Sequence, residues 1–322
     1  MGNDQTRQVL YEAAESALAA PSIFNTQPWS WRVHEDRLEL HADRSRQLAT
    51  ADSSGRLLTI SCGVALHHAM VAVRGFLLQV QLLPDTADAD LLAVLWPSGP
   101  ALPDPRRDGL RLAIAARHTD RRPFQKTPVD GTILDRLTTA CAAQGAHLYL
   151  VGWHQMSTLA LAAVAAGALE LSSPGYRMEL ADWTHRPLWS GDGVPVETAV
   201  AQTPRRVPVR DFAPFGGPVT PAGLDNDFGA TYGIIHTNAD TRHDWLTAGM
   251  GLSAVLLTAT AARLGSATIS DVTEPDMIRD HIRGLLPSGY PQVAVRIGHP
   301  QPGQPAAAPR RPAAEVISGA WA

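Results

Sequence analysis

A cluster of arginine and hydroxyl side chains lies in the segment Arg117–Phe124, which reads RHTDRRPF. Arg117, Thr119 and Arg121 alternate, so in an extended chain they project to the same side. Guanidinium groups offer paired N–H donors that match phosphate oxygens, and a hydroxyl adds a further donor. The segment therefore predicts a phosphate site. The alternative is a basic helix end, because Leu110–Ala116 predicts the last turns of a helix and cations favour that end of the helix dipole.

A second motif, GMGLSA at Gly249–Ala254, matches the dinucleotide-binding pattern G-x-G-x-x-A, and Asp271 follows at a plausible distance. That pattern must directly follow a strand. Here Asp240–Ala248 predicts a helix that starts at a capping residue and runs through the glycines. A Rossmann-type NAD dehydrogenase is therefore a distant alternative.

Composition limits the classes of protein that remain. The 322 residues suffice for one large domain or two ordinary ones, and the net charge of −4 provides no field that attracts nucleic acid. Cys62 and Cys141 form no CxxC pair, so we expect a reduced, cytoplasmic protein. His67 and His68 are adjacent in a predicted helix and point in different directions, so we expect no metal site.

The N-terminus and the apolar runs predict neither a signal peptide nor a membrane partner. Asp4, Arg7 and Glu12 leave no apolar region at the start of the chain. The nearest apolar run, Ala248–Ala262, is too short and too rich in Gly, Ser and Thr for a membrane span.

The periodicity of apolar residues predicts mixed secondary structure. Helices are predicted over Asp4–Ala20, Arg56–Leu78, Ile133–Ala143, His154–Leu171 and Asp240–Leu264. Strands are predicted over Trp29–His34, Arg37–His41, Gln79–Leu83, Leu91–Trp96, His147–Val151, Tyr232–Thr237 and Gln292–Ile297, the first two as a hairpin. From Ser172 to Gly229 the pattern is irregular, which is typical of a lid or of disorder. The aromatic residues of this stretch favour a lid that packs on something; they are Tyr176, Trp183, Trp189, Phe212 and Phe215.

The two long helices resemble each other. Ser61–Phe76 aligns with Thr247–Leu264, which places Gly63 opposite Gly249. Small residues on a helix face let a second helix approach closely. The similarity predicts an internal duplication whose two helices pack across a pseudo-twofold axis; the alternative is two ordinary alanine-rich core helices.

Four motifs together resemble a known family. The loop APSIFNTQPW, the segment RHTDRRPF, the helix AGMGLSAVLLTATAARLGS and the strand PQVAVRIGHP follow the order found in FMN-dependent nitroreductases. The length and the doubling resemble the Acg-like branch, in which one chain mimics the usual homodimer. The resemblance implies an α+β, nitroreductase-like fold with a mixed or antiparallel sheet, long central helices and an internal pseudo-duplication.

The resemblance also implies which residues contact FMN. The arginines and threonine of RHTDRRPF match an R-x-S-x-R phosphate segment, and a basic pair near the C-terminus adds to it. The loop after the first helix is lent by the opposite half, and the backbone of LGSATIS lies against the flavin. The implied contacts are Ser22, Asn25, Gln27, Arg117, Thr119, Arg121, Gly265, Ser266, Ser270, Arg310 and Arg311.

The resemblance divides the chain near residue 105. The first half, 1–105, would hold the flavin-contacting loop 21–29 and the central helix 56–78. The second half, 106–322, would hold the phosphate-binding segment 117–124, the lid 172–229, the central helix 240–264 and the tail 299–322. Because each half has only part of the motifs, we expect one FMN per chain and a monomer.

The implied activity is reduction of nitroaromatic or quinone-like acceptors by NAD(P)H in a ping-pong cycle. No catalytic side chain is expected, because the flavin carries the chemistry. The alternative is a protein that sequesters FMN beneath a closed lid, with little turnover.

Overall fold

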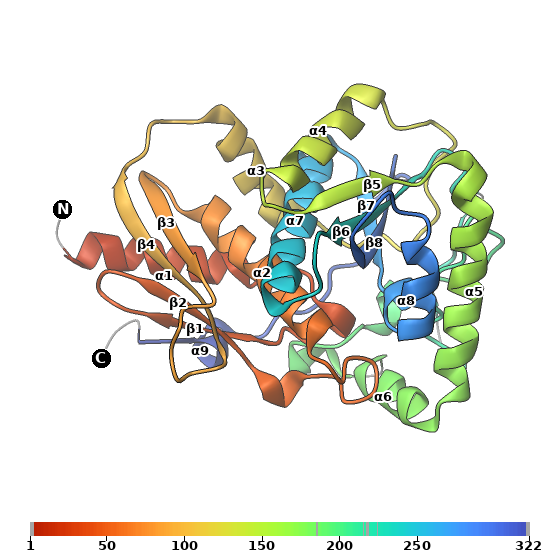
Figure 1. Cartoon of the computed structure of the whole chain (residues 1–322), viewed down its shortest axis with the longest axis horizontal. Helices are drawn as coiled ribbons and strands as arrows, with labels where there is room; N and C mark the ends of the chain where they lie inside the picture. Colours follow the sequence, from red (N-terminus) through yellow and green to blue (C-terminus); the bar gives the residue numbers. More distant parts are fainter. Residues whose placement is uncertain (1–2, 185, 215, 217–218, 224, 320–322) are drawn as a thin grey trace.

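The computed structural model describes residues 3–184, 186–214, 216, 219–223 and 225–319. Two β-sheets, each built mainly from one half of the chain, lie on either side of a central pair of helices (Figure 1). The architecture is α+β, as the sequence predicts.

The first sheet has the strand order β3-β4-β2-β1-β9. Its first four strands are antiparallel, and β1 and β2 form the predicted hairpin. β9 pairs in parallel with β1, so the end of the chain returns to the first sheet. The strands are β1 (Trp29–Val33), β2 (Leu38–Ala42), β3 (Phe76–Leu82), β4 (Leu91–Pro100) and β9 (Ile317–Ser318).

The second sheet repeats the order of the first. It consists of β5 (His147–Leu150), β6 (Thr231–Thr237), β8 (Tyr290–Gly298) and β7 (Gly265–Ile269), in that spatial order. If β5, β6, β7 and β8 are matched to β1, β2, β3 and β4, the two sheets have the same spatial order, read from opposite edges. All neighbouring pairs of the second sheet are antiparallel. In each half a long helix joins the second strand to the third. The two halves thus show the pseudo-duplication that the sequence predicts.

The backbones of the central helices α2 (Arg56–Ala72) and α7 (Arg242–Ala261) are in contact at Gly63 and Gly249. A Cβ built on Gly63 would overlap the carbonyl oxygen of Leu246 and lie 3.0 Å from Cα of Gly249. A Cβ on Gly249 would likewise overlap the carbonyl of Ile60. The prediction that these helices pack closely is therefore confirmed.

Several predicted boundaries are wrong. α2 ends at Ala72 rather than Leu78, because Gly75 turns the chain into β3 with a φ of +75°. β7 and α8 were not predicted, and the stretch from Ser172, predicted to be irregular, contains α6. The remaining helices are α1 (Asn3–Ala17), α3 (Pro105–Ala116), α4 (Gly131–Ala142), α5 (Met156–Ser172), α6 (Pro174–Thr184), α8 (Asp276–Arg283) and α9 (Ala313–Val316).

The helix predicted over His154–Leu171 is also the most apolar long helix of the described chain. Among the described residues, Trp153–Ser172 is long and apolar enough to cross a membrane by length and composition alone, and 33% of that window is buried inside the structure. The run Ala248–Ala262, considered nearest from the sequence, instead forms part of α7, which is buried along most of its length.

Gly63→Ala should destabilise the fold strongly, because the added methyl group cannot be accommodated without separating α2 from α7. Overpacking of this kind costs roughly 1–3 kcal/mol or more. Gly109→Ala in α3 is the matched control: no atom lies within 4 Å of the position that its methyl group would take, so it should be neutral or stabilising by up to about 1 kcal/mol. Urea unfolding measures both, and equal stability of the two variants would contradict the close crossing.

Candidate functional site

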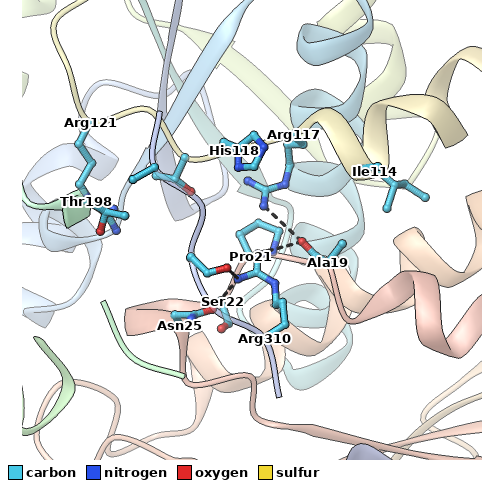
Figure 2. Close-up of a pocket in the computed structure, with 14 residues that line it drawn as sticks. Ala19, Pro21, Ser22, Asn25, Ile114, Arg117, His118, Arg121, Thr198 and Arg310 are labelled. Carbon is cyan, nitrogen blue, oxygen red and sulfur yellow. Dashed lines mark hydrogen bonds between the residues drawn. The ribbon is translucent and has the colours of Figure 1, made fainter. Parts of the chain in front are cut away.

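A cavity of about 170 Å³ lies where the loop after α1, the segment after α3 and the C-terminal tail meet (Figure 2). Both halves of the chain therefore contribute to its wall. It is lined by Ala19, Pro21, Ser22, Asn25, Ile114, Ala115, Arg117, His118, Thr119, Arg121, Thr198, Ala306, Ala308 and Arg310.

A buried arginine, Arg117, and a partly buried one, Arg310, converge in this cavity. Nη2 of Arg117 and Nη2 of Arg310 donate to the same carbonyl oxygen, that of Ala19, at 3.2 and 3.1 Å (Figure 2). Burial first, and then the charge of Arg310, lowers the pKa of Arg117 to about 9, and burial lowers that of Arg310 to about 10. Both values leave the side chains charged at neutral pH.

Within the described part of the chain, no carboxylate forms an ion pair with Arg117 or Arg310, and the buried Nε of each has no hydrogen-bond partner. Buried charges are costly unless they are paired. The arrangement is therefore suited to an anion that enters the cavity and accepts hydrogen bonds from both guanidinium groups.

The segment Arg117–Phe124 is held in place from β7 and β8. The amide of Asp120 donates to the carbonyl of Ser266 at 3.0 Å, in line with a backbone bridge between Thr119 and Ser266. Arg296, buried in β8, donates to the carbonyl of Asp120 at 2.8 Å. An arginine in the middle of the apolar strand PQVAVRIGHP was the signal for this support, and the sequence analysis missed it.

Arg117, Thr119 and Arg121 all line the cavity, on the side where their alternation places them. Arg117 directly follows the last residue of α3 as its C-cap, and it is the first residue of the extended segment. The guanidinium of Arg121 lies 4.5 Å from the ring centre of Phe212, and burial lowers its pKa to about 10. His118 lines the cavity too, although the sequence analysis did not select it.

Side-chain hydrogen bonds of Asn25 connect the loop after α1 to two distant segments of the chain. Its Nδ2 donates to the carbonyls of Gly193 and Pro309, at 3.0 Å each. Its Oδ1 accepts from Nη1 of Arg310 at 3.1 Å, so it orients one of the two cavity arginines. Ser22 also lines the cavity.

Two implied contacts, Gln27 and Arg311, do not reach the cavity. Nε2 of Gln27 donates to the carbonyl of Gly191 at 2.8 Å, and its Oε1 accepts from the amide of Arg311 at 2.9 Å. The Arg311 guanidinium lies 3.6 Å from Asp43 and 3.8 Å from Glu315. Neighbouring side chains of an extended segment point in opposite directions, so only Arg310 of the basic pair faces the cavity.

Two smaller hollows, of about 70 and 40 Å³, adjoin the cavity and share Pro21 and Ser22 with it. The larger runs along the end of β7, where Ser270 and Asp271 line it. The smaller ends against apolar side chains of the two central helices, including Ile60 and Leu252. Together they form a path from the arginine pair to the helix crossing.

Gly265 and Ser266 lie outside this path, although the resemblance implies that they contact the flavin. Gly265 packs against the ring of Phe124, where an added Cβ would lie 2.7 Å from Cε1. Ser266 is buried beneath Thr119. In LGSATIS, the residues nearer the end of the strand line the path, and those at its start support RHTDRRPF.

The segment 172–229 borders the path, and of the aromatic residues expected there Phe212 lines it, whereas Phe215 lies outside the described residues. Tyr176 is buried, and the centre of its ring lies 6.3 Å from that of Phe24. The Arg186 guanidinium lies 3.9 Å from the centre of the Trp183 ring. Trp189 is 87% exposed. None of these three lines a hollow of the path. Tyr176 instead packs in a small core with Phe24 and Phe212, which themselves line the path, so it lies behind the wall rather than in it. That the three residues act as a lid stays a prediction.

The residues of this segment that face the path are Thr198, Val209, Arg210 and Phe212. Arg210 holds them in place, because its Nη2 lies 2.7 Å from Glu274 and 3.1 Å from Glu170. Burial opposes the charge of Arg210, but Glu274 holds its pKa well above the usual value. This ion pair fastens the segment over the path, and the sequence offered no local signal for it.

Comparison with known proteins gives consistent matches. The sequence model of the nitroreductase family matches residues 114–299. The Mycobacterium tuberculosis protein named "Putative NAD(P)H nitroreductase Rv3131" is 37% identical, over 88% of this chain and 82% of its own length. "Putative NAD(P)H nitroreductase acg" of the same organism is 32% identical, over 97% and 96%.

Solved structures match at low sequence identity. A nitroreductase with bound FMN from Desulfitobacterium hafniense is 14% identical, with a TM-score of 0.41, covering 65% of this chain and 97% of that one. The FMN and NADPH-dependent nitroreductase NfnB from Sphigopyxis is 18% identical, with a TM-score of 0.40 and the same coverage.

Inorganic phosphate should raise the melting temperature of the ligand-free protein by several degrees, because it would neutralise the arginine pair. A ligand at a hundred times its Kd stabilises the folded state by about 2.7 kcal/mol. Arg310→Gln should abolish most of this response. Arg44→Gln, at a surface arginine 2.8 Å from Asp90, should preserve it. An undiminished response in Arg310→Gln, measured by differential scanning fluorimetry, would place the anion elsewhere.

Proposed function

The chain belongs to the nitroreductase family, and from this premise we propose that it is an FMN-dependent oxidoreductase driven by NAD(P)H. Its acceptors are small nitroaromatic or quinone-like molecules that alternate with the nicotinamide in a ping-pong cycle. The observation that carries the proposal is the pair Arg117 and Arg310, which has no counter-ion among the described residues and lies at one end of a path lined by β7.

The donor set at the arginine end fits the FMN phosphate. The guanidinium groups of Arg117 and Arg310 supply charged N–H donors, and Thr119 adds a hydroxyl in the same wall. Phosphate recognition favours arginine at such positions because the planar guanidinium offers two parallel donors. Asn25 and Ser22 supply polar groups from the first half of the chain.

The other end of the path fits a flat, partly apolar ring. The last residues of β7 present backbone along one side, and Ile60 and Leu252 form an apolar end. Arg121 places positive charge beside the path, which favours a ring that gains negative charge on reduction. FMN, when bound, supplies hydride and electron transfer, so this chain needs to bind, orient and tune the ring rather than provide an acid–base pair.

Both halves of one chain contribute to the proposed FMN site. The first half supplies the loop with Ser22 and Asn25, and the second supplies Arg117, Thr119 and Arg310. We propose one FMN per chain and a site that requires no residue from a second chain.

Arg117→Ala should weaken FMN binding about ten- to a hundred-fold and riboflavin binding much less. Only FMN carries the phosphate, and a charge-assisted hydrogen bond is worth roughly 1.5–3 kcal/mol. Isothermal titration or flavin fluorescence measures both constants. Riboflavin serves as the internal control: an equal loss for the two flavins would indicate a general folding defect or a different phosphate site.

A second candidate function, FMN sequestration with little turnover, is favoured by one observation. The wall formed by Val209, Arg210 and Phe212 is fastened by a buried ion pair to Glu170 and Glu274. A segment held this firmly would shield the ring from nicotinamide while leaving FMN bound. The two functions differ in whether NAD(P)H reaches the ring.

Phe212→Ala distinguishes the two functions, because it opens the wall without breaking the ion pair of Arg210. Loops that gate a site open on microsecond to millisecond timescales, so an enzyme should be reduced by NAD(P)H in both wild type and variant. A sequestering protein should be reduced by dithionite alone, and Phe212→Ala should then allow reduction by NAD(P)H. Stopped-flow absorbance follows the reaction; if the variant keeps its flavin but NAD(P)H reduces neither form, the wall is not the barrier.

A further inference from the structure

His118 lies in the wall of the cavity between Arg117 and Thr119, although its place in the alternating segment did not single it out. Its ring lies beside the Arg117 side chain (Figure 2). The residue is half-buried, so solvent reaches the imidazole. Among the described residues of the wall, only this one ordinarily titrates near neutral pH, because the remaining polar side chains are arginines, an amide and hydroxyls.

The charged side chains around His118 are all positive. Arg117 and Arg121 belong to its own segment, and Arg310 enters from the C-terminal tail. The loop after α1, the end of α3 and the segment after α6 contribute only uncharged side chains, and no carboxylate lines the cavity in the described part of the chain. Burial first, and then the charges of Arg117 and Arg310, lower the pKa of His118 below its ordinary value. The imidazole of the ligand-free protein is therefore neutral at neutral pH.

An oxyanion in the cavity reverses the balance of charge at His118. A phosphate dianion brings two negative charges into a wall that otherwise holds only positive ones, and a nearby opposite charge favours the protonated imidazole. The protonated ring carries a donor on each nitrogen, so it adds a charged N–H to those of the arginines. Proton and anion therefore favour each other, and each raises the affinity for the other by the same factor.

We propose that His118 is a third cationic ligand of the anion, and that the cavity takes up a proton when a phosphate group enters it. The proposal deepens the proposed FMN site and rests on it, and it makes FMN bind more tightly as the pH falls. The two arginines carry permanent charge, whereas His118 becomes charged only with the ligand. A histidine thus adds a donor without leaving a third unpaired charge in the empty cavity.

His68 in α2 is a second histidine on which both cavity arginines act, but it does not take this proton. It is fully buried and is not part of the cavity wall. Its Nδ1 lies 3.0 Å from the carbonyl oxygen of Val64 and 2.8 Å from Oγ of Ser253. Burial first, and then the charge of Arg117, holds its pKa well below the ordinary value. The proton is therefore assigned to His118.

The direction of the pH dependence follows from the two states of His118. Its pKa is below the ordinary value in the empty cavity and higher when the cavity holds a dianion. Between these two values, binding takes up a proton, so the affinity rises as the pH falls through the pKa of the occupied state. The affinity levels off below the pKa of the empty state. Each unit of difference between the two pKa values corresponds to tenfold in affinity.

Isothermal titration with inorganic sulfate tests the proposal on the full chain freed of flavin. Sulfate stays a dianion throughout, whereas phosphate itself titrates near neutral pH. From pH 8 to pH 5.5, sulfate should bind the wild type about tenfold more tightly or better. His118→Gln should still bind sulfate through the arginines, with an affinity that changes less than about twofold. His243→Gln, at an exposed histidine in the first turn of α7, is the matched control and should behave as the wild type.

Proton NMR of the imidazole ring gives a readout that does not depend on activity. The signal that disappears in His118→Gln identifies His118. Its pKa should rise by at least about one unit when sulfate saturates the protein, because a tenfold coupling in affinity requires that shift.

Three results would overturn the proposal. They are sulfate binding that is equally tight at pH 8 and pH 5.5, a pH dependence that His118→Gln retains, and a His118 signal that titrates identically with and without sulfate. Titration with FMN separates this proposal from the proposed function. Sulfate binding with proton uptake on His118, in a protein that does not bind FMN, contradicts the proposed function alone. FMN binding whose pH dependence is the same in His118→Gln contradicts the proton coupling alone.

Discussion

The contact between Gly63 and Gly249 is the constraint on which the arrangement of the two halves depends. With no Cβ at either position, the backbones of α2 and α7 touch, and each helix keeps the sheet of its own half close to the other. The loop after α1 and the segment after α3 consequently meet along the seam between the halves. A cavity with walls from both halves follows directly from this close approach.

The arginines around the cavity fall into two groups. Some are paired with carboxylates and stabilise the fold, whereas others are suited to binding a ligand. Arg296 pairs with Asp227 at 2.5 Å, and Arg210 pairs with Glu170 and Glu274, so these charges are neutralised within the fold. Arg117 and Arg310 have only backbone and amide oxygens as partners among the described residues. An uncompensated charge is expensive to bury, so a fold that retains two of them together has a place for an anion.

The loop after α1 connects three separate parts of the chain at the cavity. Phe24, Asn25 and Gln27 have φ values of 45°, 54° and 50°, a region that non-glycine residues rarely occupy and that costs of order 1–3 kcal/mol each. The side-chain hydrogen bonds of Asn25 and Gln27 to the chain near Gly191 and to the C-terminal tail offset that cost. The strained loop, the covering segment and the tail therefore hold one another in place.

The sequence by itself determined the features that depend on local pattern: the first hairpin, the two long helices with their aligned glycines, and the alternation of Arg117, Thr119 and Arg121. It did not determine which face of an extended segment meets the cavity. Arg310 and Arg311 are chemically alike, yet only one faces inward, and Gln27 turns away from the cavity to hold the tail. The aromatic residues of the segment after α6 suggested a cover but not which of them faces the path, because the positions of Val209 and Phe212 follow from the ion pairs of Arg210 with carboxylates on other elements. Periodicity fixes the relative direction of side chains within one element, whereas contacts between distant elements decide what each side chain meets.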